Sequence, residues 1–304
     1  MINRVLFIGS KESGFRMLET LQKISKDTLV GCVTVNDTDD IRSELKKIKQ
    51  FCFQRKIPIE VLSGRCDLTD SIKKYKPELC IVMGWYYLIS KEIIEMVQNG
   101  FIGIHNSLLP AYRGFAPVVW SILSGDKETG FSIFSFDEGM DTGNIWYQEK
   151  VEIDHNDYVG DVLNKIDEAI YLFFEKHYAE ILSENIKPVP QKAWGISYGA
   201  RRTPEDGRID WSQDAKEVYD FIRAQSHPYP GAYTEYKNEK IIVWRSEIFP
   251  YPIHGKPGQI GLIKNEYVVI VCGFNSGIII RKVDIKGIEC PVKEVVKGMC
   301  HRMI

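Results

Sequence analysis

The sequence predicts an open α/β domain followed by a smaller β-rich domain. Over roughly the first 200 residues, buried-strand runs alternate with helical stretches, a pattern typical of parallel sheets covered by helices. The remainder contains short strands separated by turn motifs such as "PYPG", "KPG" and "FNSG", which indicate a small barrel or sandwich. We therefore place the domain boundary near residue 200, with domains over 1–200 and 201–304.

The alternation of strands and helices begins at the N-terminus. "RVLFIG" (4–9) is a continuous apolar run, and "ESGFRMLETLQKIS" after it has its apolar residues at helical spacing. Ser90 suits the N-cap of the helix "SKEIIEMVQ". The other expected elements of this part are the strands "LVGCVTV" (29–35), "IPIEVL" (57–62) and "LCIVMG" (79–84), and the helix "IRSELKKIKQFCFQRK" (41–56).

Two further strands and a long helix complete the first domain. "GFSIFSFD" (130–137) and "NIWYQEKVEI" (144–153) flank the tight "EGMDTG" turn, and an amphipathic helix is expected over roughly 157–183. One helix, "AKEVYDFIRAQ", opens the second domain. Because parallel sheets present their ligand chemistry at the carboxyl ends of strands, the loops 9–14, 84–89 and 105–114 should share one edge.

The charge balance argues against nucleic acid as the default partner. Lys and Arg number 39 against 41 Asp and Glu, so no global positive field attracts phosphate polymers or acidic membranes. No apolar run approaches the roughly 18 residues of a membrane span, and "MINRVLFIGS" resembles a first strand more than a signal peptide. We expect a cytoplasmic protein without a membrane partner.

The cysteines support the same expectation. There are seven, an odd number, and none forms a C-x-x-C pair, so we interpret them as reduced core thiols. Cys300 beside His301 does not by itself make a metal site, and we expect no metal. The cysteines are Cys32, Cys52, Cys66, Cys80, Cys272, Cys290 and Cys300.

Two titratable residues stand where a site is expected. His105 ends the apolar run "GFIGIH", which delivers an imidazole to the sheet edge, although a lone histidine is more often structural. Asp141 lies in "DEGMDTG", and an aspartate between turn glycines is most often a turn former. If Asp141 faces His105, its carboxylate would orient the imidazole and raise its pKa.

Other motifs have equally ordinary alternatives. "GSKESG" (9–14) could bring backbone N–H groups and Lys11 to an anion, but it lacks the third glycine of a dinucleotide fingerprint and does not match a P-loop. Arg113, between Tyr112 and Gly114, suits a phosphate or carboxylate, or is an exposed loop arginine. The aromatics of "GWYYLI" and "PYPGAY" could be core and turn residues.

The combination of these motifs resembles one family. "IHNSLLPAYRGFAPVVWSILSGDKETGFSIFSFDEGMDTG" is similar to the formyltransferases that use 10-formyltetrahydrofolate, and its interval from His105 to Asp141 matches theirs. "RRTPEDGRIDW" and "RAQSHPYPGAY" resemble the junction and C-terminal domain of the longer members. The resemblance implies a Rossmann-like formyltransferase domain followed by an OB-like open barrel.

The resemblance also implies roles for individual residues. His105 matches the family's proton-transfer residue and Asp141 the aspartate that tunes it. The positions that match the folate-lining residues are Tyr87, Leu88, Ile89, Phe115, Asp137, Glu138, Gly139 and Met140. The candidate contacts for a nucleotide diphosphate are Ser10, Lys11, Tyr112, Arg113 and Arg201.

Gly103 departs from the family pattern, because members usually carry there an asparagine thought to stabilise the oxyanion of the reaction. Losing one preorganised donor should cost on the order of 3 kcal/mol. Asn106 would point to the opposite face of a regular strand, so it is a poor substitute. We expect His105 itself, or an ordered water in the space beside Gly103, to supply the hydrogen bond.

The acceptor is expected to be a nucleotide-linked amino sugar carrying a 4-amino group, such as a UDP-4-amino-trideoxy sugar of pseudaminic-type or surface-glycan biosynthesis. "RRTPEDGRIDW" is similar to the sugar enzymes, and "VNDTDDIRSE" is acidic where the tRNA enzymes carry a basic insertion. Residues 205–304 hold 14 Lys and Arg against 13 Asp and Glu, which does not favour tRNA. Methionyl-tRNA formylation, an inactive folate-binding or nucleotide-sugar-binding homologue, formyl-ester hydrolysis and a homodimeric assembly all stay open.

Overall fold

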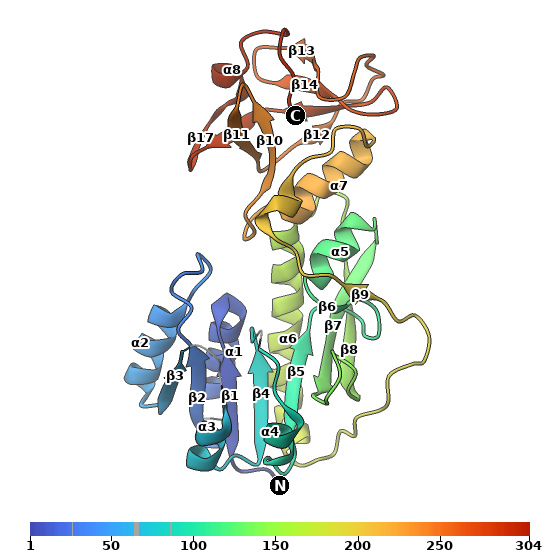
Figure 1. Cartoon of the computed structure of the whole chain (residues 1–304). Coiled ribbons are helices and arrows are strands. Elements are labelled where there is room, and N and C mark those ends of the chain that lie inside the picture. The colour runs from blue at the N-terminus through green and yellow to red at the C-terminus, as the bar shows by residue number, and fades with distance from the viewer. Residues whose placement is uncertain (26, 64–66, 86) are drawn as a thin grey trace. The chain divides into compact units, whose positions relative to one another are not determined.

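The computed structural model describes residues 1–25, 27–63, 67–85 and 87–304 (Figure 1). The chain forms two compact units that are not contiguous in sequence. The first unit contains Met1–Gly114, Gly130–Val151 and Asn164–Tyr198, and the second contains Phe115–Thr129, Glu152–Leu163 and Gly199–Ile304. The boundary near residue 200 stays a prediction.

A seven-stranded sheet of the described residues forms the centre of the first unit, in the order β3-β2-β1-β4-β5-β7-β8. The first five of these strands are parallel, and β7 is antiparallel to β5. Figure 1 shows the arrowheads of β1, β4 and β5 at the same edge. The strands are β1 (Val5–Gly9), β2 (Leu29–Val35), β3 (Ile59–Leu62), β4 (Leu79–Met83), β5 (Phe101–His105), β7 (Glu128–Ser135) and β8 (Ile145–Glu152).

The parallel strands are apolar because both faces of the sheet are covered. Every residue of β1 and β4 is buried, and residues from both strands enter a hydrophobic cluster with Leu68, Phe101 and Val97. The helices of the first unit are α1 (Lys11–Ser25), α2 (Leu45–Arg55), α3 (Thr69–Tyr75) and α4 (Lys91–Glu95). The long helix α6 (Val159–Leu182) begins in the second unit and continues in the first.

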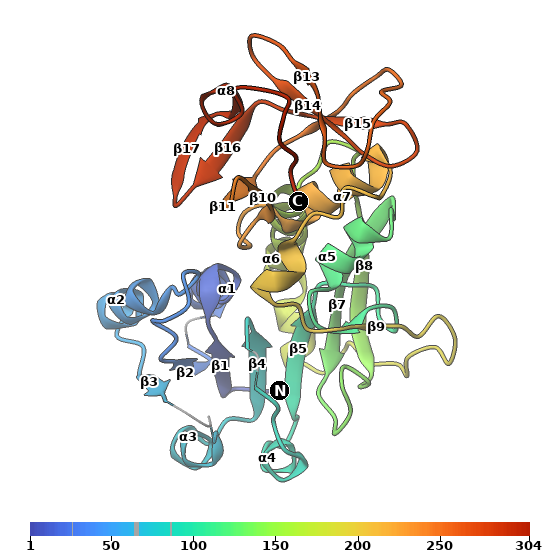
Figure 2. The ribbon, with the colours of Figure 1, turned by 45° about the horizontal axis from the view of Figure 1, so that its top comes forward.

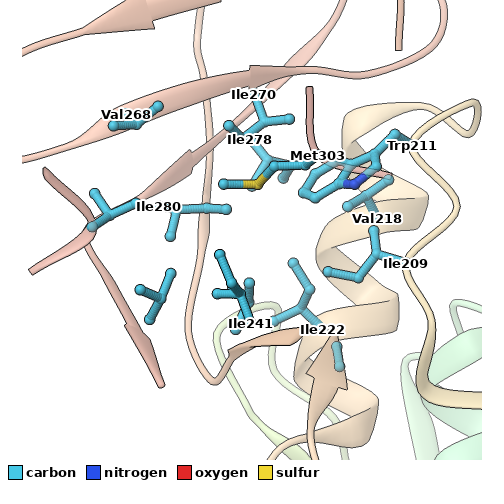
Figure 3. Packing of buried hydrophobic residues seen from close by; sticks show 14 of the residues in the cluster. Ile209, Trp211, Val218, Ile222, Ile241, Val268, Ile270, Ile278, Ile280 and Met303 are labelled. Carbon is cyan, nitrogen blue, oxygen red and sulfur yellow. The ribbon is translucent and has the colours of Figure 1, made fainter. Parts of the chain in front are cut away.

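The second unit is built mainly from two four-stranded antiparallel sheets, β10-β11-β16-β17 and β12-β15-β14-β13 (Figure 2). Figure 3 shows their side chains packed with Trp211, Val218 and Ile222. The strands are β10 (Ala232–Tyr236), β11 (Glu239–Val243), β12 (Glu247–Ile248), β13 (Ile260–Ile263), β14 (Val268–Val271), β15 (Gly277–Ile280), β16 (Lys282–Ile285) and β17 (Ile288–Pro291).

The remaining elements are short, apart from α7, which begins at a full capping box. The Asp214 carboxylate accepts the Glu217 N–H at 2.8 Å, and the Glu217 carboxylate accepts the Asp214 N–H at 3.2 Å. These elements are α5 (Pro117–Leu123), α7 (Ala215–Gln225), α8 (Val292–Val295), the 3-10 turn η1 (Pro204–Gly207), and the two-residue strands β6 (Arg113–Gly114) and β9 (Tyr198–Gly199).

The predicted fold class, a mixed α/β domain followed by a β-rich domain, is confirmed. One helix prediction was wrong in detail, because α2 begins at Leu45 rather than near residue 41. The helices α3 and α5 were not predicted, because seven residues give too few turns to establish a helical period. Ser90 is the N-cap of α4, but its side chain makes no capping hydrogen bond.

The described residues include no helix that is both long and apolar enough to cross a membrane. The cysteine prediction can be followed for six residues, because Cys66 lies outside the described residues. Four of the six free thiols are buried, whereas Cys290 is half-buried and Cys300 is exposed. The described buried cysteines are Cys32, Cys52, Cys80 and Cys272.

Candidate active site at the carboxyl end of the central strand

His105 lies at the carboxyl end of β5 and is only 8% exposed. Its Nε2 atom lies 2.7 Å from the main-chain oxygen of Tyr112. Because a carbonyl oxygen only accepts, this hydrogen bond requires the imidazole proton to be on Nε2. The ring also packs edge-on against Phe134, with centroids 6.4 Å apart. The imidazole is therefore fixed in orientation, and Nδ1 is its basic nitrogen.

Asp141 lies beside His105, as the sequence predicted it could. Its Oδ2 atom is 3.7 Å from His105 Nδ1, which is longer than a hydrogen bond but close enough for an ion pair. The same oxygen accepts the Gly114 N–H at 2.7 Å, and Asp141 adopts a left-handed backbone conformation with φ 54°. The turn thus aims the carboxylate at the imidazole nitrogen that can take up a proton.

The expectation of free space beside Gly103 was wrong. A Cβ atom at this position would lie 2.0 Å from Phe136 Cε1 and 3.0 Å from Phe134 Cε1. The Phe136 ring stacks on Phe134 at 5.3 Å and on Phe101 at 6.4 Å between centroids. An aromatic side chain from the neighbouring segment therefore fills the space in which we expected an ordered water.

Sequence reasoning missed Gln191, which joins the two loops of the site. Its Nε2 donates to the main-chain oxygens of Asp141 (2.7 Å) and Gly143 (2.9 Å). Its Oε1 accepts from Arg113 Nη2 (2.6 Å) and Nε (3.2 Å). No motif contains Gln191, and it lies 50 residues from Asp141, so only the fold reveals this contact.

Arg113 is buried rather than exposed, with 7% of its surface accessible. Besides its bonds to Gln191, it donates from Nη1 to the Tyr198 hydroxyl at 3.3 Å. Tyr112 has φ 55°, and its N–H donates to the Ser197 hydroxyl at 2.8 Å. In this structure these two residues support the loop after His105, and their role as phosphate contacts stays a prediction.

The other candidate anion contacts, Ser10, Lys11 and Arg201, come from other segments of the chain. Lys11 is paired with Asp37 (2.7 Å) and Asp40 (2.8 Å), and the Arg42 guanidinium, with Lys11, holds the pKa of Asp40 well below its usual range. The Ser10 hydroxyl donates to the Gly84 oxygen at 2.6 Å, which joins the loops after β1 and β4 as expected. Arg201 is an exposed residue of the second unit.

The predicted folate-lining residues fall in three segments. Tyr87 and Leu88 are exposed and border a cavity of about 670 Å³, whereas Ile89 is buried. In the second segment, Asp137 accepts from Thr142 Oγ1 (2.6 Å) and from the Gly139 N–H (3.0 Å).

An ion pair brings the first two of these segments together. The Glu138 carboxylate lies 3.5 Å from the Lys91 ammonium, two residues after Ile89. Met140, in the same turn, is 43% exposed. Phe115 is the third segment; it belongs to the second unit and is 41% exposed.

Among the residues that the structure describes, no group of three or more His, Cys, Asp or Glu side chains could hold a metal ion. The site contains an oriented imidazole, a carboxylate, the backbone N–H of Gly114 and an aromatic wall. Such a set is suited to moving a proton and holding a developing negative charge.

Comparison with known proteins identifies a family. Residues 3–174 match the family described as formyl transferase, and residues 201–299 match the formyl transferase C-terminal domain. The methionyl-tRNA formyltransferase of Symbiobacterium thermophilum is 30% identical over 299 residues, which cover 93% of this chain and 88% of that protein.

Two further proteins are similar to this chain, one in sequence and one in structure. The bifunctional polymyxin resistance protein ArnA of Wigglesworthia glossinidia brevipalpis is 30% identical over 261 residues, covering 84% of this chain and 39% of that protein. The N-formyltransferase of Helicobacter canadensis, solved with folinic acid and dTDP-3-aminofucose, has a TM-score of 0.70 at 19% identity, covering 92% of this chain and 99% of that one. The match of residues 3–174 to the formyl transferase family spans more than half of this sequence. The chain therefore belongs to the formyl transferase family.

Proposed function

We propose that the protein transfers a formyl group from 10-formyltetrahydrofolate to the amino group of a nucleotide-linked deoxyamino sugar. The observation that carries the proposal is the oriented His105–Asp141 pair at the carboxyl end of β5. When bound, the folate would supply a formyl carbon that an amine can attack. The cavity beside Tyr87 and Leu88, whose lining does not include His105 or Asp141, has a volume in the range of small-molecule sites, and the Tyr87 ring suits stacking on a flat ligand.

The side chains have separate parts in this reaction. Nδ1 of His105 accepts the proton that the acceptor amine loses, while Nε2–H stays bonded to the Tyr112 oxygen. The Asp141 carboxylate, 3.7 Å away, stabilises the imidazolium until the proton is returned to the nitrogen that leaves the formyl carbon. Because Phe136 fills the space beside Gly103, we assign the stabilisation of the developing oxyanion to the positive charge of the imidazolium rather than to a further side-chain donor.

An amino sugar is the acceptor favoured by charge. The second domain is nearly neutral, and Lys11 in the first domain is already paired with Asp37 and Asp40, which leaves little positive field for a tRNA backbone. The dTDP-3-aminofucose complex of the Helicobacter canadensis neighbour supports a nucleotide sugar. Methionyl-tRNA is the second candidate, because the Symbiobacterium thermophilum relative matches over 93% of this chain.

The test incubates the protein with 10-formyltetrahydrofolate and, separately, with UDP- and dTDP-linked 4-amino and 3-amino sugars and with charged initiator tRNA. A mass gain of one formyl group on a sugar supports the proposal, and turnover with the tRNA alone overturns it. Saturable folate binding without turnover on any acceptor would instead identify an inactive homologue.

The site assignment has its own test. His105→Ala and Asp141→Asn should each lower kcat by at least about a hundredfold, because proton transfer contributes 10² to 10⁴ in rate. Their circular dichroism spectra should match that of the parent protein. Full activity in both variants would refute the assignment.

A further inference from the structure

We propose that Gln191 is a positioning residue that holds the Asp141 turn against the loop after His105. This inference deepens the proposed function, since it concerns the same site, but it can be tested without turnover. Gln191 follows α6 in sequence, and the preceding Val189 exchanges two main-chain hydrogen bonds with Ile145 of β8, at 2.7 and 2.8 Å. The segment is therefore anchored to the sheet immediately before the glutamine.

The Gln191 amide uses both of its ends. Its NH₂ group donates to the Asp141 and Gly143 oxygens, and its oxygen accepts two bonds from Arg113. Residues 192–198 that follow it are exposed, whereas Gln191 is half-buried. The Gln191 side chain thus turns inward from an exposed segment and makes four hydrogen bonds, which hold the Asp141 turn and Arg113 together.

Only an amide fits both neighbours. The Arg113 guanidinium is buried and charged, so it requires an acceptor, and an unpaired buried charge is strongly destabilising. The two carbonyls of the Asp141 turn require a donor. Glutamate would lack the donor, methionine would lack both functions, and lysine would lack the acceptor.

The four hydrogen bonds of Gln191, which we call the clamp, are connected to His105 and Asp141 in two ways. On one side the clamp fixes the backbone of Asp141, whose carboxylate lies 3.7 Å from His105 Nδ1. On the other side it fixes Arg113, and the next residue, Gly114, donates its N–H to the same carboxylate oxygen at 2.7 Å. Ser197 continues the support, because its main-chain oxygen accepts the Arg113 N–H at 2.9 Å.

The distance between the imidazole and the carboxylate therefore depends on one side chain that touches neither group's reacting atoms. Displacing a catalytic group by about 1 Å can lower a rate about a hundredfold. Loss of the clamp should thus act on kcat rather than on the affinity for either substrate, since the hydrogen bonds of Gln191 to described residues all go to the two loops.

The experiment compares Gln191→Met and Gln191→Glu with Gln54→Met, a control on an exposed position of α2 in the same unit. The direct readout is the ¹⁵N spectrum of the histidine rings. His177, whose Nδ1 lies 2.7 Å from Glu180, serves as an internal reference. We expect the His105 signals to move in both Gln191 variants, while the His177 signals and the control protein stay unchanged.

The kinetic readout is the division between kcat and KM. Both Gln191 variants should lower kcat by about ten- to a hundredfold, with KM for donor and acceptor within about threefold of the parent values. Gln191→Glu keeps an acceptor for Arg113, so it should stay folded even if Gln191→Met does not. Unchanged His105 signals, or a kcat within twofold of the parent in a folded Gln191→Glu protein, would overturn the inference. If the parent protein shows no turnover, the proposed function fails, and the ring spectra alone decide the role of Gln191.

Discussion

Gly103 and Phe136 should behave as a coupled pair, and the structure gives the size of the effect. A Cβ atom at position 103 would lie 2.0 Å from Phe136 Cε1, whereas ordinary contact begins at 3.4 Å, so the ring would have to move by about 1.4 Å. Phe134 and Phe101 stack on the same ring, so that movement disturbs both neighbours. Overpacking of this kind typically costs about 1–3 kcal/mol.

A double-mutant cycle measures the coupling. We expect Gly103→Ala to lower the free energy of unfolding by about 1–3 kcal/mol, and Phe136→Ala to lower it by about 2–3 kcal/mol, because this ring is only partly buried. In the double variant the new methyl group occupies the space that the ring leaves. The combined loss should therefore be smaller than the sum of the two by about 1–2 kcal/mol.

Urea unfolding followed by tryptophan fluorescence provides the free energies, with Gly298→Ala as the control. A Cβ atom at Gly298 meets no atom within 4 Å, so this change should have little effect. Strict additivity of the Gly103 and Phe136 changes, within about 0.5 kcal/mol, would mean that the ring does not occupy this space in solution. An increased kcat in Gly103→Asn/Phe136→Ala would further indicate that an amide at position 103 can serve the reaction.

Two predictions concern stability elsewhere in the chain. Burial raises the pKa of Asp167 from 3.8 to about 6, so the folded state binds an extra proton in this window, and stability falls as pH rises through it. Asp167→Asn removes this dependence, and its gain over the parent in urea unfolding should be about 2.5 kcal/mol larger at pH 7.5 than at pH 4. An equal gain at both pH values would contradict the burial argument. Lys56 is the C-cap of α2 and has a left-handed backbone conformation with φ 57°, which favours glycine. Lys56→Gly should therefore raise the free energy of unfolding by about 0.5–1 kcal/mol. A loss of stability would show that the lysine side chain matters more than its backbone strain.

The sequence was sufficient for the strands of the first domain and for the proximity of His105 and Asp141, whose catalytic roles stay a prediction. Apolar runs such as those of β1 and β4 are long enough to predict, and parallel pairing then places their loops at one edge. His105 and Asp141 lie in a recognisable motif, and the structure brings them within 3.7 Å. These inferences succeed because they depend on local pattern and on chain topology.

The supporting contacts could not be predicted, because they join distant residues through side-chain geometry. Nothing in "FIGIHNSLLP" indicates that Phe136 fills the space beside Gly103, which led to the wrong expectation of a water there. The sequence leaves Arg113 open as a phosphate contact or an exposed loop arginine, and its burial against Gln191 contradicts the exposed arginine. Which ligands a cationic side chain such as Arg113 can bind depends on its burial and its hydrogen-bond partners, and not on its residue type alone.

The anchoring of Val189, Gln191 and Ser197 bears on how this enzyme family can be divided into parts. A fragment that stopped at Leu182, where the last long helix ends, would keep the imidazole and the carboxylate but discard what holds their loops together. Chimaeras that exchange C-terminal domains among relatives should accordingly be joined after Tyr198. A junction placed earlier would remove the segment that carries Val189, Gln191 and Ser197, so it would test that loss as well as the new C-terminal domain.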